Sequence, residues 1–221
     1  KDSVADSEGN WSLKLDPLKA SKEPQVMTVK SSSQSLEIKN ILVGDVWLCS
    51  GQSNMAFQLK GALGAEEEIK NAKNPDIRIF TVKDSRAEKP SSDLNGSWLE
   101  CSPDTIRTFS AVAYYFGKEL NSKLNMPIGL ITSAVGGSPA EAWTSMKSLE
   151  SNPALEPIAA DFKKQVEKMP ELKKKYDEEI AEWNKLYSDK KPGDMLADGG
   201  KVPVKPQLPL SWENKKAPSV L

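Results

Sequence analysis

The stretch "GDVWLCSGQSNM", residues 44–55, joins an apolar segment to a Gly-Gln-Ser-Asn turn. With the residues before it, this segment forms "ILVGDVWLC", residues 41–49, a nearly continuous apolar run. Such a run is typical of a strand that is buried on both faces in a parallel sheet. The turn follows at once and carries Ser53. We therefore expect a parallel α/β sheet with a serine at the end of one strand.

A serine on a strand-to-helix turn is how many hydrolases present a nucleophile. The sharp turn exposes the hydroxyl, and backbone N–H groups beyond it can face an oxyanion. The motif here, "GQSNM" at residues 51–55, differs from the Gly-x-Ser-x-Gly of α/β-hydrolases because it ends in methionine. Taken alone, Ser53 can instead be a structural turn residue. Ser50 is a competing hydroxyl, but it lies before the turn.

The rest of the central region predicts alternating strands and helices. Residues 66–72 predict a short helix, residues 77–82 a second strand, and residues 128–137 a third buried strand that ends in two glycines. Residues 108–124 predict an amphipathic helix with Thr108 as its N-cap. Its apolar positions, at helical spacing, are Phe109, Val112, Phe116, Leu120 and Leu124. This alternation predicts an α/β layer fold with right-handed crossovers.

Three flanking regions differ in character from residues 41–147, which we take as the α/β core. Residues 1–40 predict short strands, at 11–15, 26–30 and from 35 onward, and suggest part of a β-sandwich. Residues 148–190 keep helical spacing across Pro170, which predicts two helices or one kinked helix. Residues 191–221 are rich in proline and predict a loop or linker.

A second glycine-rich turn follows the third predicted strand. Ligands of open α/β sheets bind at the carboxyl ends of the strands, so Gly136 and Gly137 should share an edge with Ser53. A glycine amide there could donate to an oxyanion. The alternative is that glycine merely closes the strand where φ is positive. Trp143, shortly after, could wall a sugar pocket or belong to the core.

Composition narrows the classes of function. The chain has 221 residues with 30 Lys and Arg against 31 Asp and Glu, a net charge of −1, so a nucleic-acid partner is not expected. No apolar run approaches the roughly 18 residues that span a bilayer. With no histidine and two cysteines, a structural zinc site is not expected. Serine acyl transfer needs no metal, so no cofactor is expected either. Cys49 is expected to be a small buried residue, although a disulfide between Cys49 and Cys101 stays open.

The segments "LVGDVWLCSGQSNM", "FSAVAYYFGKEL", "PIGLITSAVGGSPAEAW" and "KAPSVL" resemble the sialate O-acetylesterase family of SGNH-type carbohydrate acetylesterases. The resemblance implies an SGNH-hydrolase-like three-layer fold with a parallel sheet, here incomplete, after part of a β-sandwich and before a helical insertion at 148–190. It implies that Ser53 is the nucleophile and that its backbone N–H and a glycine of Gly136-Gly137 form the oxyanion hole. Gln52 and Asn54 would shape the turn, and Gln52 could reach the substrate.

The family's catalytic histidine, in an Asp-x-x-His motif nearer the C-terminus, has no counterpart here because the chain has no histidine. We therefore expect an N-terminal portion of a longer enzyme, inactive without its C-terminal part, which is its expected partner. The expected substrate is an acetylated sugar such as sialic acid, and the expected location is secreted or periplasmic. The alternatives are a non-catalytic carbohydrate-binding or assembly module of the same fold, and a different SGNH chemistry such as that of a thioesterase.

Overall fold

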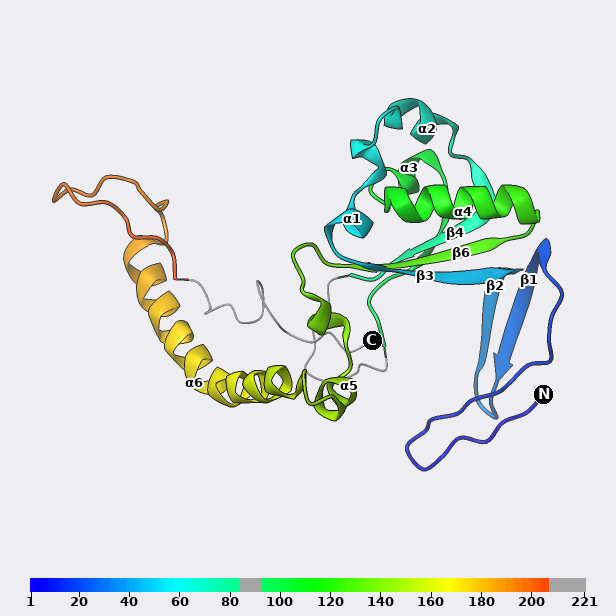
Figure 1. The fold of residues 1–221 in the computed structure, drawn as a ribbon, viewed down its shortest axis with the longest axis horizontal. Coiled ribbons are helices and arrows are strands. Elements are labelled where there is room, and N and C mark those ends of the chain that lie inside the picture. Colours follow the sequence, from blue (N-terminus) through cyan, green and yellow to red (C-terminus); the bar gives the residue numbers. More distant parts are fainter. Residues whose placement is uncertain (84–92, 207–221) are drawn as a thin grey trace. The chain divides into compact units, whose positions relative to one another are not determined.

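The structure is a computed structural model that describes residues 1–83 and 93–206 (Figure 1). These residues belong to two compact units. The first unit is made of Lys1–Lys83 and Asn95–Gly136, and the second continues from Gly137. Each unit is described here by itself.

The first unit is built on a four-stranded sheet. Its strands are β3 (Asp45–Gly51), β4 (Asn74–Thr81), β5 (Trp98–Cys101) and β6 (Ile128–Ala134). Their order is β3-β6-β4-β5. β6 pairs in parallel with both β3 and β4, and β5 adds an antiparallel strand to β4. The α/β class and the expected strands at 77–82 and 128–137 are confirmed, whereas the four-residue β5 was not predicted.

Gly44 divides the apolar run at 41–49, which is therefore two strands. β2 (Ser35–Val43) ends before it and β3 begins after it. A Cβ atom at Gly44 would lie 2.0 Å from the carbonyl oxygen of Pro127, so only glycine fits this approach. The expectation that the strand is buried on both faces is also wrong. Among the described strands β3 lies at an edge, and Val46 and Leu48 are 62% and 56% exposed.

Helices cover one face of this sheet (Figure 1). They are α1 (Ser53–Ala56), the 3-10 helix η1 (Leu59–Gly61), α2 (Ala65–Asn71), α3 (Pro103–Ile106) and α4 (Ala111–Leu124). α4 packs closely on β6, because a Cβ at Gly117 would lie only 2.5 Å from Leu130 Cδ1. Ile77, Ile128 and Leu130 are at most 1% exposed and form the centre of the core.

The helix at 108–124 is confirmed, but its expected apolar face and its cap need correction. The buried residues of α4 are Ala111, Ala113, Tyr114, Gly117 and Asn121. Of the expected apolar face, Phe109 is buried and Leu120 partly so, whereas Val112, Phe116 and Leu124 are 50%, 40% and 50% exposed. The N-cap is Ser110, whose hydroxyl accepts from the Ala113 N–H, rather than Thr108.

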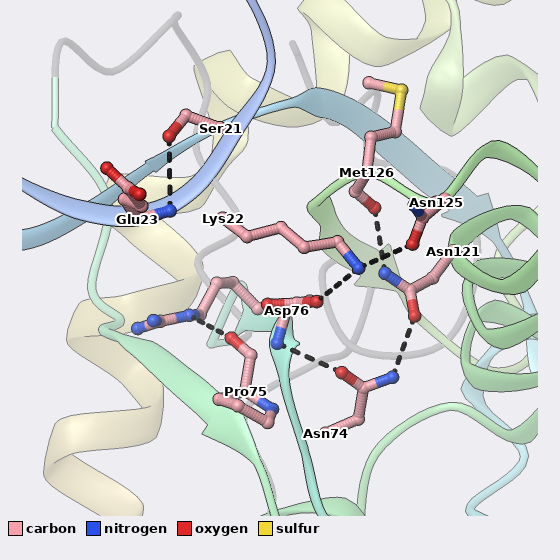
Figure 2. A network of polar contacts seen from close by, with 10 residues as sticks. Ser21, Lys22, Glu23, Asn74, Pro75, Asp76, Asn121, Asn125 and Met126 are labelled. Carbon is pink, nitrogen blue, oxygen red and sulfur yellow. Dashed lines mark hydrogen bonds and ion pairs between the residues drawn. The ribbon is translucent and has the colours of Figure 1, made fainter.

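The N-terminal region contains one hairpin, β1 (Ser21–Lys30) paired antiparallel with β2. The strand expected at residues 11–15 is absent from the structure, so that prediction is wrong. A polar network joins the hairpin to the sheet (Figure 2). Lys22 Nζ lies 3.0 Å from Asp76 Oδ2 and donates to Asn125 Oδ1 at 2.8 Å. Asn121 continues the network by donating to the Met126 carbonyl and accepting from Asn74.

The second unit is mainly helical. It contains the 3-10 helix η2 (Ala140–Trp143), α5 (Met146–Ser151) and the long helix α6 (Glu156–Tyr187), which continues through Pro170. The helical prediction for 148–190 is confirmed, with a single helix across the proline. Trp183 is buried near the end of α6 and donates from its indole N–H to the Pro203 carbonyl. Residues 191–206 contain no helix or strand, and 207–221 lie outside the described residues.

Candidate active site

Ser53 lies at the carboxyl end of β3, on the turn that the sequence predicts. β3 ends at Gly51, and α1 begins at Ser53 after a single intervening residue. Gly51 has φ +148°, a value that glycine adopts readily because it lacks a Cβ atom. Ser53 is exposed, and among the described residues its hydroxyl has no hydrogen-bond partner. The turn therefore presents a free hydroxyl at the edge of the sheet where α/β proteins bind ligands.

Gly136 lies beside this serine. β6 continues alongside β3 to its end, and the Val135 N–H donates to the Gly51 carbonyl at 3.1 Å. A Cβ atom built on Gly136 would lie 3.9 Å from both the Cα and the Cβ of Ser53. The parallel register thus brings together two residues that are 83 positions apart in the sequence. A larger side chain at 136 would extend into the space next to the serine.

Gln52 and Asn54 flank the serine and hold the turn through their backbone. The Ala56 N–H donates to the Gln52 carbonyl at 2.9 Å, and the Phe57 N–H donates to the Asn54 carbonyl at 3.4 Å. Both residues are exposed, and their side chains make no hydrogen bond within the described part of the chain. The two amide side chains are therefore available to a molecule that approaches Ser53.

The start of α4 supports the turn from the interior, a feature that the sequence analysis missed. Ser110 is 6% exposed, and its hydroxyl donates to the Met55 sulfur at 3.5 Å. The Ala111 N–H donates to the Phe57 carbonyl at 2.8 Å. The local signal was Ser110 itself, which is a preferred N-cap residue just before a helical segment. Its contact with Met55 could not be read from the sequence because 55 positions separate the two.

Gly137 belongs to the second unit, where its φ is +77°. This value agrees with the view that a glycine closes this turn for conformational reasons. In the same unit the indole N–H of Trp143 donates to the Ser138 hydroxyl at 2.8 Å. The sequence analysis placed Gly136 and Gly137 together as one feature, whereas the boundary between the two units falls between them.

Both cysteines are free thiols in the interior of the first unit, so the structure contains no disulfide between them. Burial raises the pKa of Cys49, at the end of β3. Burial also raises the pKa of Cys101 to about 11. Neither thiol is suited to act as a nucleophile, because the thiolate is the reactive form.

The described part of the chain contains neither a metal-binding cluster nor a membrane-spanning helix. In the described ranges, 1–83 and 93–206, no group of three or more Cys, Asp or Glu side chains is placed to hold a metal ion. No helix in these ranges is long and apolar enough to cross a membrane.

The sequence profile of a family described as "Carbohydrate esterase, sialic acid-specific acetylesterase" matches residues 43–183. The chain belongs to this family. The match includes the Ser53 turn, Gly136 and most of α6, so it spans parts of both units. The expected resemblance to sialate O-acetylesterases is thereby confirmed.

Individual relatives agree with this assignment. The sialate O-acetylesterase of Rattus norvegicus is 36% identical over 161 residues, which are 67% of this chain and 30% of the rat protein. The Homo sapiens protein of the same name is 37% identical over a segment that is 31% of its length. The crystal structure of a carbohydrate acetylesterase from Xanthomonas citri matches with a TM-score of 0.64 and 36% identity, over 66% of this chain and 33% of that protein. The chain thus matches about a third of these relatives.

Proposed function

We propose that Ser53 is the nucleophile of a carbohydrate O-acetylesterase. The observation that carries this proposal is the free, exposed hydroxyl of Ser53 on a turn at the carboxyl end of β3, with Gly136 beside it. Family membership supports the esterase class. A serine hydroxyl on such a turn is suited to acyl transfer once a base removes its proton.

The proposed reaction has two steps. In the first, Ser53 Oγ attacks the carbonyl carbon of an acetyl ester while a base removes the hydroxyl proton. The backbone N–H groups of Ser53 and Gly136 stabilise the negative charge that develops on the carbonyl oxygen. The sugar alkoxide leaves with the proton returned by the base, and an acetyl-serine remains. In the second step the base activates water, which releases acetate and regenerates Ser53. Gln52 and Asn54 contact the sugar.

We further propose that the base is supplied by sequence outside these 221 residues. The chain has no histidine, and a carboxylate with an ordinary pKa of about 4 is a poor base at neutral pH. The match to about a third of the relatives' length supports this view. A site that lacks a triad member keeps roughly 10³–10⁴-fold catalysis over water. The isolated chain is therefore expected to be nearly inactive.

The proposed substrate is an O-acetylated carbohydrate, with O-acetyl sialic acid as the first compound to test. The rat and human relatives are named sialate O-acetylesterases, and the Xanthomonas protein is described more broadly as a carbohydrate acetylesterase. We also propose a secreted or periplasmic location, where such sugars are encountered. Fractionation of cells that express the natural gene tests that location.

The decisive experiment measures hydrolysis of p-nitrophenyl acetate and of O-acetyl sialic acid. It compares the 221-residue chain, a chain extended to the natural C-terminus, and the extended chain with Ser53→Ala. Ser50→Ala is the matched control, because Ser50 is a serine on β3 three residues before Ser53. We expect turnover only in the extended chain. It should fall by about 10³-fold or more in Ser53→Ala and change little in Ser50→Ala.

One observation favours a second function. The absence of histidine fits a non-catalytic carbohydrate-binding or assembly module that retains the fold. An extended chain that binds acetylated sugars but hydrolyses neither substrate would support this alternative and contradict the role of Ser53. Equal loss of activity in the Ser50 and Ser53 variants would also contradict that role.

A further inference from the structure

A cavity of about 360 Å³ lies at the opposite end of the parallel strands from Ser53, between the hairpin and the sheet. Asp45, at the start of β3, lines the cavity, whereas the Ser53 turn follows the end of the same strand. At about 3.3 Å per residue, β3 separates the two places by roughly 20 Å. The cavity is therefore not part of the candidate active site. Its size falls within the usual range for small-molecule sites.

The floor of the cavity is the sheet face away from α4. Val46, Gly129 and Arg78 are directly paired across β3, β6 and β4, and so form one row on this face. Gly129 lies in the middle of that row and is covered by its neighbours. A Cβ atom there would lie 3.1 Å from Val46 Cγ2 and 3.3 Å from Trp98 Cη2. The absence of a side chain at 129 is what allows the valine and the indole ring to pack over the strand, and these two side chains form the apolar floor of the cavity.

Trp98 supplies an aromatic wall. Its side chain is 48% exposed although it belongs to a strand of the sheet. The ring packs against Phe80 with a centroid distance of 5.5 Å and a tilt of 58°, which fixes its orientation. One part of the indole is therefore held by the protein, while another part faces the cavity and is open to a ligand.

Arg78 supplies fixed polar groups beside this wall. Its side chain is 17% exposed, and its guanidinium donates to the Pro75 carbonyl and to Asn40 Oδ1, each at 2.9 Å. It also lies 3.3 Å from Glu100 Oε1, which accepts a second hydrogen bond from the Asn40 amide. The carboxylate balances the positive charge. The five N–H donors of an arginine exceed these three contacts, so donor capacity remains for a ligand hydroxyl.

Two sets of polar contacts hold the hairpin, and with it the β2 wall of the cavity, against the rest of the unit. Asn40 of β2 is bound to Arg78 and Glu100. Lys22 of β1, which does not line the cavity, is bound to Asp76 and Asn125 (Figure 2). Asn40 itself has φ +60°, an uncommon conformation for a residue other than glycine. The cavity is thus preformed, which reduces the entropy that a ligand must lose on binding.

We infer that this cavity binds a neutral pyranose ring, as a second carbohydrate site apart from Ser53. A pyranose has an apolar C–H face that can pack on Val46 and the Trp98 ring. Its hydroxyls can reach the fixed groups of Arg78 and Asn40. Of the charged residues that line the cavity, Arg78 is paired with Glu100 and Lys39 with Glu37, and Asp45 is negative. The lining therefore has no net positive charge to favour an anion. The choice of a sugar as ligand rests on the proposed carbohydrate function, whereas the site itself rests on geometry.

The test is a titration of the ¹⁵N-labelled chain with xylobiose, followed through the indole N–H signals of its six tryptophans. Trp98→Phe assigns the Trp98 signal. We expect a saturable shift of that signal with a Kd of about 1–10 mM. Gly129→Ala, whose methyl group would displace Val46 and the Trp98 ring, should weaken binding about tenfold or more. Leu63→Ala is the control, because Leu63 is a fully exposed apolar residue away from the cavity.

Several outcomes would overturn the inference. These are the absence of a saturable Trp98 shift, equal affinity in a folded Gly129→Ala variant, and tighter binding of N-acetylneuraminic acid than of xylobiose at this site. If Gly129→Ala does not fold, Trp98→Leu, followed through the Gly129 amide signal, provides the same test. Ser53→Ala should bind xylobiose normally. If the extended chain is inert but still shows the Trp98 shift, only the proposed function is contradicted. If the chain is active but shows no shift, only this second site is contradicted.

Discussion

The two faces of the four-stranded sheet carry similarly apolar side chains but differ sharply in burial. α4 covers one face of the sheet (Figure 1). On that face the paired residues Ile79 and Leu130 are at most 2% exposed. On the other face, Val46, Leu48 and Trp98 are 48% to 62% exposed. The same strands contribute to both faces, because neighbouring residues on a strand point in opposite directions. Hydrophobicity alone therefore does not decide which residues stabilise the unit; the helix layer does.

The largest expected effect compares Leu130→Ala with Leu48→Ala. Leu130 is fully buried against α4, so its truncation should lower the free energy of unfolding by about 2–5 kcal/mol. Leu48 is 56% exposed, and the same truncation there should cost less than about 1 kcal/mol. Urea denaturation of both variants measures the two values. Equal losses would show that both faces are covered in solution and would remove the contrast.

A smaller effect concerns Glu68, which ties α2 to α4 on the covered side. Glu68 Oε1 accepts from Tyr114 Oη and lies at the same 2.5 Å from Lys118 Nζ. The hydrogen bond from Lys118, followed by that from Tyr114, lowers the pKa of Glu68 below its ordinary value of 4.5. Because the folded-state pKa is lowered, this contribution is complete above about pH 4.5 and declines as the pH falls through the folded-state pKa.

Glu68→Gln should therefore cost about 1 kcal/mol at neutral pH and less at acidic pH. The measurement is urea denaturation of both proteins at about pH 7 and about pH 4. Glu67→Gln is the matched control, because Glu67 lies in the same first turn of α2. A Glu68→Gln cost that stays constant between the two pH values would rule out the charged contact as its source.

The smallest expected effect is at Val112, on the outer side of α4. Val112 is 50% exposed, so Val112→Thr should change the free energy of unfolding by no more than about 0.5 kcal/mol. Its neighbour Ala113 is 1% exposed, and Ala113→Thr should cost about 1–3 kcal/mol through overpacking. Thermal and urea denaturation of the pair measure both values. A large cost at Val112 would instead support the helix face that the periodicity of the sequence indicates.

That helix shows what the sequence could and could not predict. The spacing of apolar residues predicted that α4 exists, but not which of its faces lies on the sheet. Close packing against the sheet requires small residues on that face. Ala113 and Gly117 allow α4 to approach Leu130, while the larger Val112 and Phe116 remain half exposed. Hydrophobic periodicity depends on the apolar character of residues and not on their size, so it predicted the wrong buried face for α4.

The candidate site was likewise predictable from the sequence only in part. The adjacency of Ser53 and Gly136 was predictable, because parallel strands that end in distinctive turns share an edge. The support of Met55 by Ser110 was not, since it depends on how the start of α4 meets the turn. The short β5 was also missed, and with it the position of Trp98. Contacts between distant segments, rather than local preferences, account for these omissions.

The pairing of β3 with β6 also sets the order of events during synthesis. Asp45 of β3 pairs with Ile128 of β6, and β4 reaches β3 only through β6. At about 5–20 residues per second, a ribosome needs roughly 4–16 s to make the intervening segment. Throughout that interval β3 lacks β6, which is its partner strand among the described residues. This chain is thus expected to depend on chaperones while it is being made, and its folding rate to be limited by the closure of a long loop.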